Sequence, residues 1–368
     1  MILKSADKLQ RSFKHANCRI QSLCDLLSLH NIFINPNLLY IHCFNILAAL
    51  CYIPYKNLEY LFLVGFNEYF EETFFDENNI KYHVTDKINS INDIVTFIKE
   101  GVPIYTLCDA NTISTLNIPK NDVQIGVCSG VVVVGVDFPT KVICNQILPQ
   151  GKCELLPIDY SIFSRARTLR VYPSSPQNRC IYLELDENQT TAISKRINDV
   201  DIMMGKLSKC FRNILNDSNL LIISNVGVKG ICNFGAFYAL KSELKVLSEI
   251  DNIARVSSEI IDKVFTLKIL LLRKSIVSGS SSFNRHELAD ALFALYEITR
   301  DSRLKKASVL FRESGNKLRQ ISRFLYSVGN YTRCKKEFIG KIIDMFDEVL
   351  NLERRASEIL ANLTYYNT

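Results

Sequence analysis

Residues 126–137 read Gly-Val-Cys-Ser-Gly-Val-Val-Val-Val-Gly-Val-Asp, and residues 141–148 read Lys-Val-Ile-Cys-Asn-Gln-Ile-Leu. The four consecutive valines at 131–134 are a β-branched run of the kind carried by a strand that is buried on both faces. Pro139 separates the two segments, so the second segment is expected to form a hairpin-like neighbour of the first. Together the two segments predict the centre of a sheet.

The segments before this sheet alternate between helical and extended patterns. Ser90–Glu100 has apolar residues at positions 91, 94, 95 and 98, a helical stripe that ends at Gly101, the residue type expected just after a helix. Val102–Leu107 and Tyr82–Val84 are expected to be short strands. Leu38–Pro54 is mostly apolar, and the pattern predicts a buried helix that Pro54 ends.

Helical spacing of apolar residues dominates the chain after about Leu185. The expected helices are 190–215, 237–276, 285–299, 302–327 and 335–362. We therefore expect an α+β domain over residues 1–180, followed by an all-helical domain over residues 181–368. The apolar stripe of the last helix is interpreted mainly as core, and it leaves a homodimer interface open as an alternative.

The composition is that of a folded protein from a reducing compartment. The chain has 368 residues, 48% of them hydrophobic and 22% charged, which excludes a disordered chain and is enough for two domains. The twelve cysteines include no CxxC pair, so neither a disulfide framework nor a zinc ribbon is expected. The first twenty residues lack a long apolar stretch, and residues 38–53 are too short for a membrane span. We expect a cytoplasmic protein with no membrane partner.

The net charge of +6 falls entirely in the second half of the chain. Residues 1–180 hold 16 basic and 16 acidic residues, whereas residues 181–368 hold 28 and 22. The basic residues are interleaved with acids along helices, which is typical of solvated helix faces. No aromatic-basic repeat is present, so nucleic acid is not an expected partner. Attraction of an acidic protein is the functional alternative.

Cys43 lies near the start of the helix predicted from Leu38. A thiol at the start of a helix is close to the positive end of the helix dipole, which lowers its pKa towards a reactive thiolate. A cysteine in an apolar helix is more often a core residue than a nucleophile. The central strands strengthen the functional interpretation, because papain-like sites place a base on one strand and the group that orients it on the next. Asn145 is of the residue type that orients such a base.

Seven short motifs follow one another along the chain, at His42–Leu50, Leu61–Phe70, Gly101–Ile104, Ser129–Asp137, Phe163–Arg167, Gly227–Ile231 and Phe283–Glu297. In order and spacing they resemble the aminoglycoside side-chain acyltransferases of butirosin biosynthesis. The resemblance implies a papain-like cysteine-peptidase fold over residues 1–180 and a helical domain over residues 181–368.

The chain departs from this family at two positions. Ser129 stands where the family has its histidine, and Asn145 stands where it has an aspartate, whereas the cysteine is kept as Cys43. Since serine does not act as a base near neutral pH, we expect Cys43 to be the nucleophile and Ser129 and Asn145 to hydrogen-bond the substrate. The chain has five histidines, His15, His30, His42, His83 and His286.

Three further residues are expected to bind substrate: His42, Arg285 and His286. On a helix His42 would point about 100° away from Cys43 and so would not take its proton. A capping or core-bonded imidazole is therefore the other interpretation of His42. His286 opens a helix after a serine-rich segment, where it could reach a cleft between the domains, although it could equally be an ordinary residue of the helix start.

The resemblance implies that an acyl group passes from the phosphopantetheine thioester of a carrier protein, through Cys43, to a small amine in secondary metabolism such as antibiotic biosynthesis. Exchange between a thioester and a thiolate costs little free energy, and an amine can then attack the acyl-cysteine. No cofactor or metal bound by the chain itself is expected. The alternatives are a non-catalytic binding or scaffold relative and, with less support, a cysteine hydrolase of peptides.

Overall fold

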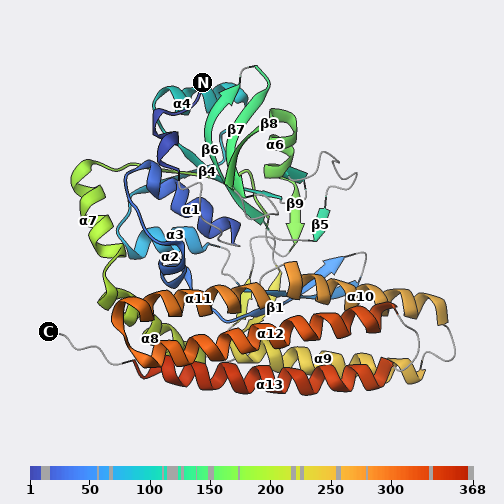
Figure 1. Ribbon diagram of the computed structural model, residues 1–368. Helices are drawn as coiled ribbons and strands as arrows, with labels where there is room; N and C mark the ends of the chain where they lie inside the picture. Colours follow the sequence, from blue (N-terminus) through green and yellow to red (C-terminus); the bar gives the residue numbers. More distant parts are fainter. Residues whose placement is uncertain are drawn as a thin grey trace. The chain divides into compact units, whose positions relative to one another are not determined.

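The computed structural model describes residues 1–9, 17–55, 58–65, 69–109, 112–113, 123–125, 128–137, 139–147, 153–172, 175–216, 221–223, 228–253, 258–278, 281–330 and 335–363. The chain is mixed α+β, with antiparallel sheets and a helix-rich C-terminal region (Figure 1). It divides into two compact units, each described by itself. The first unit comprises residues 1–43 and 69–203, and the second comprises residues 44–68 and 204–368.

The first unit contains a six-stranded antiparallel sheet with the strand order β3-β10-β4-β6-β7-β8. Its strands are β3 (Tyr82–Thr85), β4 (Ile104–Asp109), β6 (Cys128–Asp137), β7 (Lys141–Ile147), β8 (Cys153–Asp159) and β10 (Cys180–Leu183). Every residue of β6 from Cys128 to Val136 is buried, as the valine run predicts. The short strands β5 (Val123–Ile125) and β9 (Arg170–Tyr172) form a separate parallel pair.

The helices of the first unit are the 3-10 helix η1 (Lys4–Lys8) and the α-helices α1 (Cys18–Leu29), α2 (Pro36–Cys43), α3 (Phe70–Glu77), α4 (Ile91–Lys99), α6 (Tyr160–Thr168) and α7 (Glu187–Ile197). Helix α1 packs against β6 and β7, and its residues from Arg19 to Leu29 are all buried. Helix α4 begins at a capping box formed by Ser90 and Asp93 and is followed by Gly101, whose φ is +81°. Both ends of α4 were predicted from the sequence.

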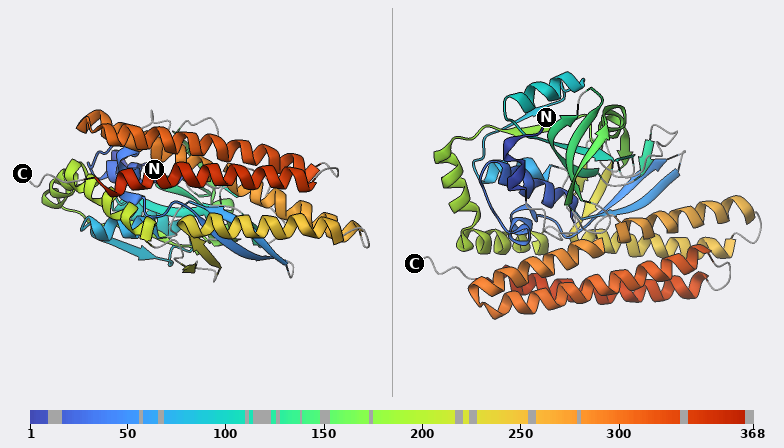
Figure 2. Two further views of the ribbon diagram at one scale, coloured as in Figure 1. Left: turned by 90° about the horizontal axis from the view of Figure 1, so that it is seen from below. Right: turned by 45° about the horizontal axis from the view of Figure 1, so that its top comes forward.

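The second unit combines a bundle of long helices with a four-stranded antiparallel sheet, in the strand order β11-β12-β1-β2. The strands are β1 (Ala49–Tyr55), β2 (Leu58–Val64), β11 (Leu221–Ile223) and β12 (Lys229–Cys232). The helices are α9 (Asn233–Ile253), α10 (Ser258–Ser278), α11 (Ser281–Thr299), α12 (Ser302–Asn330) and α13 (Lys335–Ala361), and α8 (Val200–Asn216) connects the two units. Figure 2 shows α12 and α13 running side by side along the bundle.

The helix predicted over Leu38–Pro54 is correct for residues 38–43 and wrong for the rest. Helix α2 ends at Cys43, and residues 49–55 form strand β1, which pairs with β2 along its whole length. The hydrophobic periodicity of this apolar run does not distinguish a buried helix from a buried strand, and the pairing with β2 determines that residues 49–55 form a strand. Pro54 is tolerated because β12 pairs with β1 only at residues 49–51, and the missing N–H of Pro54 falls beyond that ladder.

The structure also divides the chain at other places than the predicted boundary at residue 180. Strand β10 and helix α7 belong to the first unit, and the hairpin of β1 and β2 joins the second. The C-terminal unit is therefore not all-helical. Within the described residues, no helix is both long enough and apolar enough to cross a bilayer.

Candidate functional site

Cys18 is the first residue of helix α1, the central helix of the first unit. The Asn17 side chain caps this helix, because its Oδ1 accepts hydrogen bonds from the backbone N–H groups of Arg19 (3.0 Å) and Ile20 (3.2 Å). Whereas the rest of α1 is buried, Cys18 is only half-buried. The start of a helix carries the positive end of the helix dipole, and Cys18 lies at this end of α1.

Strand β6 approaches the start of α1 unusually closely. A Cβ atom on Gly130 would lie 2.8 Å from the hydroxyl oxygen of Tyr105 and 3.1 Å from Cα of Arg19, so this position needs glycine. The Ser22 hydroxyl of α1 donates to the carbonyl oxygen of Gly130 (2.8 Å). Cys128, two residues earlier on the same face of β6, interacts electrostatically with the Arg19 guanidinium. The first residues of β6 therefore lie beside the start of α1.

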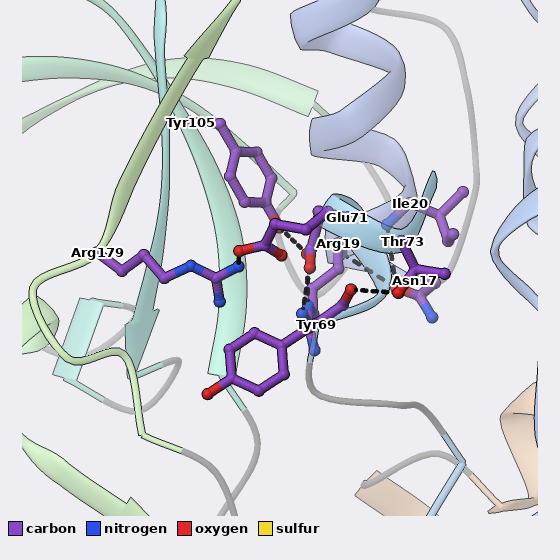
Figure 3. Close-up of polar contacts among 9 residues, drawn as sticks. Asn17, Arg19, Ile20, Tyr69, Glu71, Thr73, Tyr105 and Arg179 are labelled. Atoms are coloured by element: carbon purple, nitrogen blue, oxygen red, sulfur yellow. Dashed lines mark hydrogen bonds and ion pairs between the residues drawn. The ribbon is translucent and has the colours of Figure 1, made fainter. Parts of the chain in front are cut away.

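A buried ion pair fixes this end of α1. Arg19 donates from Nε to Glu71 Oε1 (2.8 Å) and from Nη2 to Oε2 (2.5 Å), and the Tyr105 hydroxyl also bonds to Glu71 (Figure 3). Burial opposes the charge of Arg19, but Glu71, Tyr105 and Cys128 together outweigh burial and raise the pKa of Arg19. Burial and Glu71 also raise the pKa of Tyr105 well above its ordinary value. Helix α1, helix α3 and strand β4 are thus joined through one carboxylate.

Asp109, the last residue of β4, faces the same region. It is directly opposite Cys128 in the antiparallel ladder, so the two side chains share the face of the sheet that α1 covers. Its Oδ2 accepts hydrogen bonds from the backbone N–H (2.8 Å) and hydroxyl (2.7 Å) of Thr112. Among the described residues, the other oxygen, Oδ1, has no hydrogen-bond partner although Asp109 is fully buried. A carboxylate with one open acceptor is the kind of group that accepts a proton.

The structure places Cys43 differently from the sequence expectation. Cys43 is the last residue of α2, where the dipole is negative and disfavours an anion, and it is 5% exposed. It lies close to Cys24, whose pKa is raised by burial, by Asp25 and by Cys43. Cys18, and not Cys43, is therefore the cysteine at the start of a helix.

Ser129 and Asn145 lie on opposite faces of the sheet. Asn145 is opposite Val132 in the ladder and so shares the face of Gly130, towards α1. Ser129 alternates with Gly130 and is directed to the other face, together with its ladder partner Cys108. The two side chains are not brought together. Asn145 shares a face with its ladder partner Val132, and Ser129, three residues before Val132 on β6, points to the opposite face.

Asn145 instead belongs to a buried amide–carboxylate cluster. Its Nδ2 donates to Asp25 Oδ2 (2.5 Å), and Gln21 Nε2 donates to Asp25 Oδ1 (3.0 Å). Burial raises the pKa of Asp25 to about 7, against the two hydrogen bonds, which favour its charged form. Asn145 therefore orients the Asp25 carboxyl within the core.

This cluster makes stability depend on pH. Between about pH 4 and about pH 7, Asp25 is protonated in the folded protein and ionised in the unfolded chain. The free energy of unfolding therefore falls as the pH rises through this window, by about 4 kcal/mol in total. Urea unfolding at several pH values measures the slope. Asp25→Asn should flatten it, whereas exposed Asp86→Asn should not; equal slopes in all three proteins would contradict the assignment.

His42, expected to bind substrate, is a core residue. Its Nε2 is 2.9 Å from the carbonyl oxygen of Ile197, and the ring meets Phe74 edge-on at 6.0 Å between centroids. His42 is 2% exposed. The core-bonded interpretation therefore describes it, and substrate binding would require the imidazole to leave this hydrogen bond.

The other described histidines of the first unit are His30 and His83. His30 follows the far end of α1, and burial lowers its pKa to about 4. The His83 Nε2 lies 2.7 Å from a carboxylate oxygen of Glu184. His15 lies outside the described residues. Within the described part of this unit, the ladder places Asp109 opposite Cys128.

Arg285 and His286 belong to the second unit, at the start of α11. Arg285 donates from Nε and Nη2 to the Glu353 carboxylate (2.7 and 2.8 Å) and from Nη1 to the carbonyl oxygen of Leu47. Arg285 is 1% exposed, so it holds the bundle together and presents no group to a ligand. His286 packs against Gly315 of α12, and burial followed by Arg319 lowers its pKa.

Sequence reasoning missed Cys18, Cys128 and Asp109. The signal for Cys18 is present as Asn17, a strong N-cap residue, followed by apolar residues at helical spacing. No sequence feature marks Cys128 or Asp109, because both depend on the register of β4 against β6.

No protein-family model matches the chain, and no curated protein matches it either.

Proposed function

We propose that the chain is a cysteine-dependent acyltransferase with Cys18 as its nucleophile, built on a papain-like first unit. The observation that carries the proposal is the placement of Cys18 at the capped start of a buried central helix, against an antiparallel sheet. A central helix with a thiol at its first residue and a sheet carrying the partner groups is the arrangement that papain-like chemistry needs. The resemblance in motif order to the butirosin side-chain acyltransferases supports the same class of reaction, whereas the choice of Cys18 over Cys43 rests on the structure alone.

The proposed reaction has two steps. The Cys18 thiolate attacks the carbonyl carbon of an acyl thioester on the phosphopantetheine arm of a carrier protein. A new C–S bond to Cys18 forms, the C–S bond to the arm breaks, and the arm leaves as a thiolate that takes a proton from water. A small amine then attacks the acyl-Cys18, forming a C–N bond and releasing the thiolate. The amine loses one proton in this step, and no oxidant or metal is required.

Asp109 is the proposed acceptor of that proton. Its Oδ1, which has no hydrogen-bond partner in the described part of the chain, belongs to a side chain on the face of the sheet that α1 covers, and Thr112 holds the other oxygen in place. A carboxylate suffices because a neutral amine needs no base to attack a thioester, only one to take the proton afterwards. This separates the proposed reaction from peptide hydrolysis, in which an imidazole must activate the nucleophile and protonate a poor leaving group.

The test is to incubate the purified chain with an acyl-loaded carrier protein and, separately, with the acyl thioester of free phosphopantetheine. Intact mass should show one acyl group added to the chain, removable by an added amine with formation of the amide. If neither donor acylates the chain, the proposal fails.

A second candidate is a non-catalytic binding protein with the same fold. One observation favours it: the part of β6 facing the start of α1 carries Cys128 and Gly130 where a papain-like site would use an imidazole. This candidate expects no acyl adduct in the assay above and no reaction of Cys18 beyond that of an ordinary thiol.

A further inference from the structure

The net charge of the chain is concentrated on helix α12. Residues 302–330 contain seven basic residues and one acidic residue, whereas the rest of the chain contains 37 of each. The basic residues are Arg303, Lys305, Lys306, Arg312, Lys317, Arg319 and Arg323. The sequence interpretation of a dispersed basicity is therefore incomplete, because one helix carries a charge equal to that of the whole protein.

The fold presents four of these charges as a single line. Residues 305, 312, 319 and 323 fall within about 40° of one another around the helix, and they extend over roughly 27 Å of its length. All four side chains are exposed. The opposite face is anchored in the bundle by the buried residues Leu304, Phe311, Leu318, Ile321 and Leu325. We call Lys305, Arg312, Arg319 and Arg323 the α12 basic stripe.

The stripe is only partly neutralised by neighbouring acids. Arg312 pairs with Asp290 of α11 (2.6 Å). The Lys305 ammonium lies 5.5 Å from the centre of the Tyr296 ring, a contact that leaves its charge in place. Among the described residues, Arg323 has no ion-pair partner. A positive field therefore remains along the exposed face of α12.

Two exposed apolar side chains lie on either side of this line, Val309 about 40° and Tyr326 about 20° beyond its edges around the helix. Val309 is 57% exposed and Tyr326 is 50% exposed, and the Arg273 guanidinium of α10 lies 4.8 Å from the Tyr326 ring centre. Contact with another apolar surface buries an exposed apolar side chain and so favours binding, and a phosphate backbone offers no such surface. A protein helix can meet both the basic and the apolar residues by alternating carboxylates with apolar side chains.

We propose that the α12 basic stripe, with Val309 and Tyr326, is a docking surface for an acidic amphipathic helix of a partner protein. The interval of seven residues between Lys305, Arg312 and Arg319 spans two helical turns, so a helix lying along α12 with carboxylates at the same interval places each one beside a basic residue. This surface does not depend on Cys18 chemistry and holds for either candidate function.

The test uses fluorescence anisotropy with the full chain. The probes are a labelled 21-residue helical peptide with Glu and Leu repeated every seven residues, the same peptide with Gln for Glu, and a 20-base-pair DNA duplex. We expect the acidic peptide to bind at low salt, at least about tenfold more tightly than the Gln peptide and the DNA, and to weaken as salt rises. Val309→Ser should weaken it severalfold.

A charge-matched pair of variants separates the stripe from net charge. The stripe variant carries Lys305→Glu, Arg319→Glu and Arg323→Glu, and the control carries Lys209→Glu, Lys245→Glu and Arg355→Glu, at exposed positions on other helices of the same unit. We expect the stripe variant to lose at least about tenfold in affinity and the control less than about threefold. Equal losses, preferential binding of DNA, or no binding of the acidic peptide would each overturn the proposal.

Discussion

Replacing Cys18 by alanine is expected to abolish acyl transfer. Because Cys18 forms the covalent intermediate in the proposed reaction, its loss should lower the rate of amide formation from an acyl thioester by at least about 1000-fold. Alanine is a good helix former and leaves the Asn17 cap intact, so the fold should be kept. Thermal unfolding of the variant checks that point, and the adduct seen by intact mass should disappear.

Cys43→Ala is the matched control for this result. Cys43 is buried at the carbonyl end of α2, and its loss should leave at least about half of the transfer rate, at a cost of about 1 kcal/mol in stability. If Cys43→Ala abolishes transfer and Cys18→Ala does not, the nucleophile is the one suggested by the sequence motif, and the helix argument is overturned.

Arg285→Ala is expected to be the most destabilising substitution in the second unit. It leaves the Glu353 carboxylate, which is fully buried, without its bidentate partner, and it removes a donor from the carbonyl oxygen of Leu47. Breaking one side of a buried ion pair costs about 3–5 kcal/mol because the remaining charge is uncompensated. Urea unfolding followed by circular dichroism measures the loss.

Two further variants distinguish this explanation from general fragility. Exposed Arg355→Ala on α13 should change stability by less than about 0.5 kcal/mol. Combining Arg285→Met with Glu353→Leu should recover most of the loss, since no charge is then left buried. A cost below about 1 kcal/mol for Arg285→Ala would show that water reaches Glu353 and that the pair does not hold the bundle.

The strands and helices that the sequence predicted well are those with a local signal. The valine run at 131–134 gave β6, and the stripe between Ser90 and Gly101 gave α4, since a cap and a terminating glycine mark its ends. The run over Leu38–Pro54 has no such signal, and its strand forms only because β2 and β12 lie on either side of it. Hydrophobicity alone could not separate those two outcomes.

The candidate site was harder to predict than the fold because it depends on which face each strand residue takes. Asn145 was placed on the right strand, but its partner is Asp25 of α1 and not Ser129. A shift of one residue along β6 exchanges Ser129 for Cys128 at the start of α1, and a single sequence does not determine which face each of them takes. The register of β4 against β6 determines it.

The most direct test of the central claim is the order in which the cysteines react. Brief treatment of the folded chain with iodoacetamide at neutral pH, followed by peptide mapping, measures the alkylation rate at each position. Cys18 should react at least about tenfold faster than Cys43, which is buried, and faster than glutathione under the same conditions, because Cys18 is only half-buried and lies at the start of α1. Reaction of Cys43 before Cys18, or of Cys18 no faster than glutathione, would contradict the assignment of Cys18 as the nucleophile.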